Sequence, residues 1–257
     1  MNILNLPKRV SVYFQNKKTL AKNPRHNDTY IVEFPKSGIT WLSTIIANAA
    51  LIQSGREEIA NFASTRTHIP DIHINRNIGP PAFTTPSVRF IKSHAERNDN
   101  YGVVIYLVRK PLSVLTSYYR YLNDRNLNPY NDFDSFCKSD EYGAPSWKRH
   151  VKSWLDAPAM GRFIHVIRYE DMLADTRKEI QLLNQNFGWG LGDTAINLAI
   201  QRSTAEEMRM SENLFASRNP RYKGVFVKGK DDIIVDDQTI SYINHLCFDE
   251  LRLAGFM

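Results

Sequence analysis

The sequence is typical of an α/β protein in which helices cover a central parallel sheet. Patterns characteristic of strands and of helices alternate along the chain, which is the order expected of this class. Residues 101–108 (YGVVIYLV) form a nearly continuous apolar run, as a strand buried in a parallel sheet should. Residues 30–51 predict a strand, a short loop and a helix in direct succession. With 257 residues, 42% of them hydrophobic, the chain can bury a substantial core in one domain, residues 1–257.

The first strand, loop and helix form the most informative stretch of the chain. Residues 30–34 are β-branched and aromatic, Pro35 ends the strand, and Gly38 permits a tight turn. Thr40 is expected to cap the helix that follows. A Lys-Ser-Gly loop between a strand and a helix is the layout of a phosphate cradle, because loop amides and the helix N-terminus face the anion. Lys36 precedes the single glycine, so this is not a Walker A loop.

The rest of the chain continues the alternation. Residues 1–29 are a lead-in, with the period of a short edge strand at 10–14. Residues 212–235, rich in Arg, Lys and Gly at their centre, are expected to form a mobile loop. Further strands are predicted at 88–91, 101–108 and 163–167, and helices at 57–62, 111–122, 133–137, 147–155 and 176–187, in two parts of 193–210, and after Asp236.

Composition limits the partners and the compartment. The net charge of +6 suits an anionic ligand, and nucleic acid or an anionic membrane surface would fit the charge equally well. No compact block of Lys and Arg is present, so we expect no nucleic-acid partner. Cys137 and Cys247 are the only cysteines and cannot form a disulfide framework, which favours a reducing compartment. Without an apolar run of membrane-spanning length or a signal-peptide pattern, we expect a cytoplasmic protein with no membrane span.

Residues 35–41 (PKSGITW) closely resemble the 5′-phosphosulfate loop of the sulfotransferases that use 3′-phosphoadenosine 5′-phosphosulfate (PAPS), usually Pro-Lys-Ser-Gly-Thr-Thr-Trp. Lys92 and His94 resemble the Lys-Thr-His of that family, which holds its catalytic base at a strand end. Arg109 and Ser117, followed by Tyr-Tyr, reproduce the spacing of the segment that binds the nucleotide's 3′-phosphate. The resemblance runs from about residue 30 to the C-terminus and implies a P-loop-like, three-layer α/β fold with a central parallel sheet flanked by helices.

Three later segments extend the resemblance. Tyr169 lies in a segment similar to the family's Arg-Tyr-Glu-Asp, in which the tyrosine approaches the adenine. Ser203 takes an adenine-contacting position, while Ala205 replaces a phenylalanine that would stack on the base. In the 217–230 region, Lys223 and Gly224 match the Lys-Gly of a loop laid over the 3′-phosphate, and Arg221 is one place from the family's arginine.

The resemblance implies a reaction in which a sulfuryl group moves from PAPS to a hydroxyl or amine, leaving adenosine 3′,5′-bisphosphate (PAP). His94 would be the general base, with a near-neutral pKa suited to that task. Lys36 would stabilise the leaving phosphate oxygen, and Lys92 would help to hold the sulfuryl oxygens. No metal is needed, because Lys, Arg and the helix dipole supply the positive charge. The residues implied to bind the nucleotide are Lys36, Ser37, Gly38, Ile39, Thr40, Trp41, Arg109, Ser117, Tyr169, Ser203, Arg221, Lys223 and Gly224.

Two other classes stay open on the sequence. One is a P-loop kinase that uses ATP and Mg²⁺, against which the missing Walker A lysine position stands. The other is a non-catalytic nucleotide- or polyanion-binding protein, which would not need both Lys36 and His94. The acceptor is expected to be a small molecule, glycan or lipid with a hydroxyl group, in a pocket shaped by residues 54–86 and 123–145. No pattern in the sequence indicates the acceptor's identity or the oligomeric state.

Overall fold

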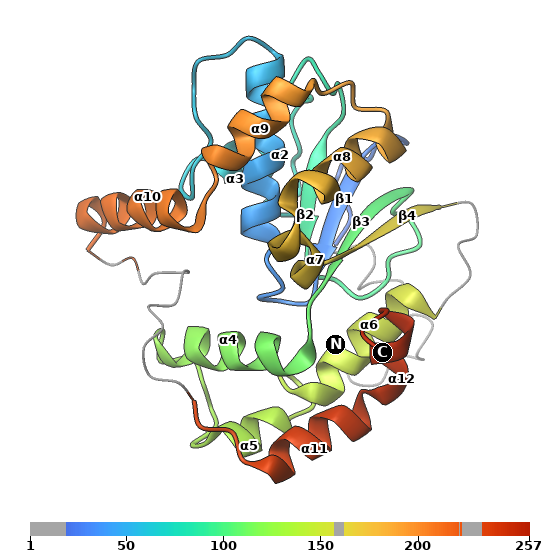
Figure 1. Cartoon of the computed structure of the whole chain (residues 1–257), viewed down its shortest axis with the longest axis vertical. Helices are drawn as coiled ribbons and strands as arrows, with labels where there is room; N and C mark the ends of the chain where they lie inside the picture. Colours follow the sequence, from blue (N-terminus) through green and yellow to red (C-terminus); the bar gives the residue numbers. More distant parts are fainter. Residues whose placement is uncertain (1–18, 157–161, 221, 223–232) are drawn as a thin grey trace, which may run out of the picture.

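The computed structural model describes residues 19–156, 162–220, 222 and 233–257. Within them, the core is a four-stranded sheet in the order β2-β1-β3-β4 (Figure 1). Each neighbouring pair is parallel, as the sequence predicts. The predicted edge strand at 10–14 lies outside the described residues. The strands are β1 (Thr29–Glu33), β2 (Phe90–Ser93), β3 (Val103–Val108) and β4 (Phe163–Arg168).

Helices cover both faces of the sheet, which confirms the three-layer α/β prediction. One face packs mainly against α2 (Ile39–Gln53), α8 (Thr176–Phe187) and α9 (Asp193–Gln201). The other packs against α4 (Pro111–Asn123), α5 (Phe133–Cys137), α6 (Ala144–Leu155), α11 (Asp237–Leu246) and α12 (Phe248–Leu253). The short helices α3 (Thr65–His68) and α7 (Tyr169–Ala174) complete the first side, and α10 (Ala205–Arg218) projects away from the sheet (Figure 1).

The strand sequences explain why both faces are covered. Successive side chains of a strand point to opposite faces. In β1, Tyr30 and Val32 join the core on the α6 side, whereas Ile31 joins the core on the α2 side. All five residues of β1 are buried. A strand that is apolar on both faces is therefore stable only between two helical layers.

Two helix predictions at the start of the chain are wrong. Thr40 is not the N-cap of α2, because the helix begins at Ile39 and Gly38 occupies the cap position in a left-handed conformation. Residues 57–62 are not helical, and the short helix lies at α3 instead. Asn48 explains the second difference: its side-chain amide accepts from the Ala60 amide at 2.8 Å and donates to the Ala60 carbonyl at 2.9 Å. These tertiary bonds replace the helical ones.

Two boundaries near the C-terminus also differ from prediction. Residues 212–218, expected in the mobile loop, continue α10. Asp236 caps the last helical region as predicted, and its side chain accepts from the Thr239 amide at 2.7 Å. That region is not one helix, because it breaks at Cys247 into α11 and α12. Cys137 and Cys247 are free and buried, and no helix in the described part of the chain is long and apolar enough to cross a membrane.

A buried ion pair ties together the starts of β1 and β2. The Arg89 guanidinium is 2% exposed and donates to both carboxylate oxygens of Asp28, at 2.6 and 2.5 Å. It also donates to the backbone carbonyls of Asn23, Ile78 and Gly79. The arginine thus fixes the lead-in and the loop before β2 against the sheet. A buried cation held in this way depends on its carboxylate.

We predict that Asp28→Ala lowers the free energy of unfolding by about 3–5 kcal/mol, because it leaves the Arg89 charge buried without its counter-ion. Urea unfolding followed by circular dichroism measures the change. The exposed pair Lys138–Asp134, with Nζ to Oδ2 at 2.7 Å, is the matched control. Lys138→Ala should leave the midpoint unchanged. An equally small effect of Asp28→Ala would show that the buried pair does not stabilise the fold.

Candidate functional site

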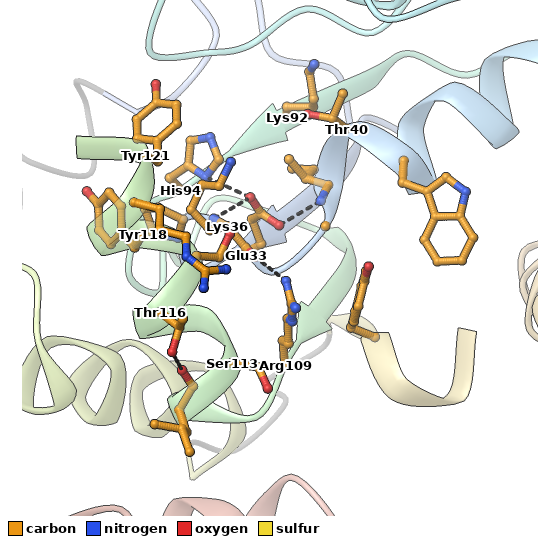
Figure 2. A pocket seen from close by; sticks show the side chains of 18 of the residues that line it. Glu33, Lys36, Thr40, Lys92, His94, Arg109, Ser113, Thr116, Tyr118 and Tyr121 are labelled. Carbon is orange, nitrogen blue, oxygen red and sulfur yellow. Dashed lines mark hydrogen bonds and ion pairs between the residues drawn. The ribbon is translucent and has the colours of Figure 1, made fainter. Parts of the chain in front are cut away.

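A cavity of about 940 Å³ opens at the carboxyl ends of β1, β2 and β3. This is the edge at which open α/β sheets bind ligands. Figure 2 shows the lining side chains, with Glu33 at the centre of a group of interactions. The described residues that line the cavity include Glu33, Lys36, Gly38, Ile39, Thr40, Trp41, Asp71, Lys92, His94, Arg109, Ser113, Thr116, Ser117, Tyr118, Arg120, Tyr121, Tyr169, Arg209, Ile233 and Val235.

The loop between β1 and α2 turns its amides toward one carboxylate. Both Lys36 and Gly38 have positive φ, +77° and +116°, which reverses the chain within three residues. The Lys36 amide donates to Glu33 Oε1 at 3.2 Å, and the Ile39 amide donates to Glu33 Oε2 at 2.7 Å (Figure 2). A left-handed lysine is unfavourable by itself. The Glu33 carboxylate therefore helps to hold the loop in this conformation.

The other loop amides divide into two groups. The Ser37 amide donates to the Phe34 carbonyl at 3.2 Å, and the Trp41 amide donates to the Gly38 carbonyl at 3.0 Å. Ser37 is fully buried and its hydroxyl donates to the same Phe34 carbonyl, at 2.8 Å. The amides of Gly38 and Thr40 have no hydrogen-bond partner among the described residues. Open amides at the start of a helix form an anion-binding position.

Two lysines border this position. Burial lowers the pKa of Lys36 to about 8, while the Glu33 carboxylate acts in the opposite direction. Lys36 Nζ lies 4.6 Å from the centre of the Tyr121 ring. Lys92 belongs to β2 and is only 9% exposed, and its pKa is lowered, chiefly by burial. Both lysines, to which the sequence analysis assigns catalytic roles, line the cavity.

His94 follows β2 and lies between two carboxylates. Its Nδ1 is 3.7 Å from Glu33 Oε1, and its Nε2 is 3.7 Å from Asp71 Oδ2. Burial lowers the pKa of His94 to about 4; Asp71 opposes this effect, and the neighbouring His73 and Lys92 add to it. The near-neutral pKa expected from the sequence is therefore not what this environment produces. The imidazole is neutral at pH 7 and can accept a proton.

A parallel bridge brings Asp71 and His73 to this point. Residues 70–72 pair with Lys92: its amide donates to the Pro70 carbonyl at 2.8 Å, and the Ile72 amide donates to the Lys92 carbonyl at 3.0 Å. His73 Nε2 then accepts from the His94 amide at 2.9 Å, and the two rings stack at 5.7 Å. Sequence reasoning missed Glu33, Asp71 and His73. Of these, Glu33 carried a signal, because it ends the strand before the loop.

Arg109 and Ser117 line the same cavity, from the end of β3 and from α4. One guanidinium nitrogen of Arg109 donates to the Lys36 carbonyl at 3.3 Å, and Arg109 Nε is buried without a hydrogen-bond partner in the described part of the chain. The sequence predicts that these two residues bind one anion, and the structure places both on the lining of the same cavity. A guanidinium N–H without a partner can donate to an anion.

Three distant segments form an aromatic wall beside the loop. The rings of Trp41 and Tyr169 meet edge to face, with centroids 5.8 Å apart. Trp41 Nε1 donates to the Ser203 carbonyl at 2.9 Å, and the Arg109 guanidinium lies 4.3 Å from the Tyr169 ring centre. Ser203 is fully buried, and its hydroxyl accepts from Asn48 Nδ2 at 3.0 Å, so its side chain is not among those lining the cavity.

The other segments and residues predicted to form the site contribute unequally to the cavity. Of the two segments expected to shape the acceptor pocket, 54–86 contributes Asp71 to the cavity, and 123–145 contributes no lining residue in the part of the chain described. Arg221, Lys223 and Gly224 lie outside the described residues. Arg209 and the pair Ile233 and Val235, on either side of that gap, line the cavity.

We predict that Gly38→Ala lowers the free energy of unfolding by about 1–3 kcal/mol, because of strain at its positive φ. A Cβ at this position would lie 2.6 Å from the Tyr169 ring, so the ring would have to move. Gly55→Ala is the matched control, because Gly55 also has positive φ, +68°, but has nothing within 4 Å of the added atom. Thermal unfolding of both variants separates strain from the clash. Equal effects of the two substitutions would argue against the close approach of Tyr169.

Comparison with known proteins agrees with this geometry. Residues 26–231 match the family model of the sulfotransferase domain. The dog protein Sulfotransferase 1A1 is 27% identical over 198 residues, covering 71% of this chain and 66% of the relative. The chain thus spans slightly less than two thirds of that relative's length.

Solved structures share the fold. A mouse sulfotransferase, SULT7A1, complexed with PAP has a TM-score of 0.61 at 19% identity, covering 94% of this chain and 89% of its own. Retinol dehydratase in a complex with retinol and PAP has a TM-score of 0.67 at 15% identity, covering 94% and 86%. At this identity the likeness concerns the fold alone, whereas the family model covers most of the chain. The protein belongs to the sulfotransferase domain family.

Proposed function

We propose that this protein transfers a sulfuryl group from PAPS to a hydroxyl or amine of an acceptor and releases PAP. The observation that carries the proposal is that Lys36 and His94 lie next to the same carboxylate, that of Glu33. Glu33 Oε1 accepts from the Lys36 amide at 3.2 Å and lies 3.7 Å from His94 Nδ1. The lysine of the anion loop and a neutral imidazole therefore face the same cavity.

The chemistry requires an acceptor that loses a proton and a leaving oxygen that gains negative charge. His94 takes the proton from the acceptor, and the resulting imidazolium lies between the carboxylates of Glu33 and Asp71. Lys36 stabilises the charge on the leaving phosphate oxygen. Lys92, on the same rim, helps to hold the sulfuryl oxygens. As in phosphoryl transfer, alignment and charge stabilisation provide most of the catalysis.

The nucleotide occupies the rest of the cavity in this proposal. The open amides of Gly38 and Thr40, with the Thr40 hydroxyl, bind the 5′-phosphosulfate. Ser37 and Ile39 shape the loop, and the wall of Trp41 and Tyr169 receives the adenine, with Ser203 holding Trp41 from behind. Arg109 and Ser117 bind the 3′-phosphate. We assign Arg221, Lys223 and Gly224 to the same phosphate on the family pattern alone.

Structures with the same fold support both the proposed nucleotide and the proposed kind of acceptor. Two structures with this fold were solved with PAP, and one of them also holds retinol, a small molecule with a hydroxyl group. We infer an acceptor of this general kind, without a metal ion in the reaction, and a location in the cytoplasm. An ATP-dependent kinase is the competing function that the same cavity would allow, and the next experiment separates the two.

Calorimetric titration with PAP, ADP, AMP and ATP with Mg²⁺ tests the proposal. We predict that only PAP binds tightly, because we assign its 3′-phosphate to Arg109 and Ser117. Arg109→Ala should weaken the binding of PAP by about 1.5–3 kcal/mol, the contribution of a hydrogen bond to a charged group, and leave the affinity for AMP unchanged. Preference for ATP with Mg²⁺ would favour the kinase, and equal affinity for all four would refute the 3′-phosphate site.

Replacement of the base should separate binding from turnover. We predict that His94→Ala lowers the turnover rate at least about 10²–10⁴-fold, the range of general base catalysis, while PAP affinity stays within a few-fold. His68→Ala is the matched control, since His68 belongs to α3 and is not among the cavity-lining residues. Turnover is measured by release of PAP with a phenol or alcohol acceptor. Near-normal turnover by His94→Ala would remove His94 as the base.

A further inference from the structure

The Glu33 carboxylate takes up two of the amides at the mouth of the anion loop. Its two oxygens accept from the Lys36 and Ile39 amides, while the neighbouring amides of Gly38 and Thr40 stay open among the described residues. The side chain is 3% exposed. A bound 5′-phosphate would therefore lie beside a buried carboxylate that shares its loop. Two anions in one loop repel each other strongly unless one takes up a proton.

We propose that Glu33 binds a proton when the nucleotide binds, and that its carboxyl group sets the pH range over which the loop accepts an anion. This inference rests on the proposed function, because it takes PAP or PAPS as the anion. A protonated carboxyl keeps one oxygen as an acceptor for the Ile39 amide. The loop then keeps its shape, while the negative charge beside the phosphate disappears.

The surroundings of Glu33 make such a change of charge accessible near neutral pH. Burial raises the pKa of Glu33 to about 7, while the Ile39 amide and the Lys36 charge act against that rise. Lys36 faces the carboxylate from the loop, and Lys92 faces it from β2. His94, after β2, and Tyr106, from β3, are two further titratable groups that interact with it. A bound phosphate would raise the pKa of Glu33 further, so its protonated form dominates in the complex.

The consequence is a pH dependence with a defined sign. In the free protein Glu33 is ionised above a pH of about 7, so binding there requires uptake of a proton. The affinity for PAP should fall about tenfold for each pH unit above that value. Lys36 and His94 also contribute protons to anion binding, because a phosphate raises the pKa of each. Only the part of the proton uptake that is lost when the Glu33 carboxyl group is removed tests the proposal.

The experiment is calorimetric titration of the full chain with PAP between pH 7 and pH 8.5, in pairs of buffers that differ in ionisation enthalpy. Over this range the phosphates of PAP are largely ionised. We expect the wild-type protein to take up about one proton more than Glu33→Gln does. At pH 8, Glu33→Gln should bind PAP about tenfold more tightly than wild type. Glu33→Ala provides the same comparison if the glutamine variant does not fold.

Glu179→Gln is the matched control, because Glu179 is also a buried carboxyl group with a raised pKa, but it belongs to α8 and is not among the residues that line the cavity. Its proton uptake should equal that of the wild type. Equal uptake by wild type and Glu33→Gln would overturn the proposal, as would weaker binding by Glu33→Gln at every pH, which would make Glu33 a brace for the loop. No PAP binding by any of these proteins would overturn the proposed function and this inference with it.

Discussion

The carboxylate of Glu33 is the constraint on which the candidate site depends. It ends β1 and accepts from two amides of the loop that follows, at 3.2 and 2.7 Å. These bonds hold Lys36 in a left-handed conformation and direct the start of α2 into the cavity. A buried carboxylate without such partners would be strongly unfavourable. Loop and carboxylate therefore stabilise each other, although the carboxylate would oppose the anion that we propose as the ligand of the loop.

The Glu33 carboxylate also connects the loop of Lys36 with His94. On one side it meets the loop of Lys36, and on the other it lies 3.7 Å from the His94 ring. His94 is further enclosed by Asp71 and His73, which the parallel bridge to Lys92 brings in from a segment with little regular structure. Burial keeps the imidazole neutral, and the Asp71 carboxylate favours its protonated form. His94 thus lies at the carboxyl end of β2 as a neutral ring with a carboxylate on each side.

The side of the cavity to which we assign the nucleotide is built from contacts between distant parts of the chain. Trp41 lies in the first turn of α2, Tyr169 begins α7, and Ser203 lies between α9 and α10. Their association fixes the aromatic wall beside the loop, and it explains why Gly38 leaves no room for a side chain next to Tyr169.

The sequence by itself determined the features that depend on neighbours in the chain. These include the parallel α/β order, the loop of residues 35–41, the Asp236 cap, and the placing of Lys36, Lys92, His94, Arg109 and Ser117 at strand ends or on the helix after one. Local chemistry suffices for them, because period, turn residues and caps act over a few residues.

Only the tertiary structure decided the rest. The Ala60 segment is extended instead of helical because a side chain of α2 takes its backbone bonds. The low pKa of His94 and the high pKa of Glu33 come from burial, which no short pattern reports. The bond from Trp41 to Ser203 joins residues 162 positions apart. Such contacts form only when the sheet brings its strand ends together, so they become visible only in the folded chain.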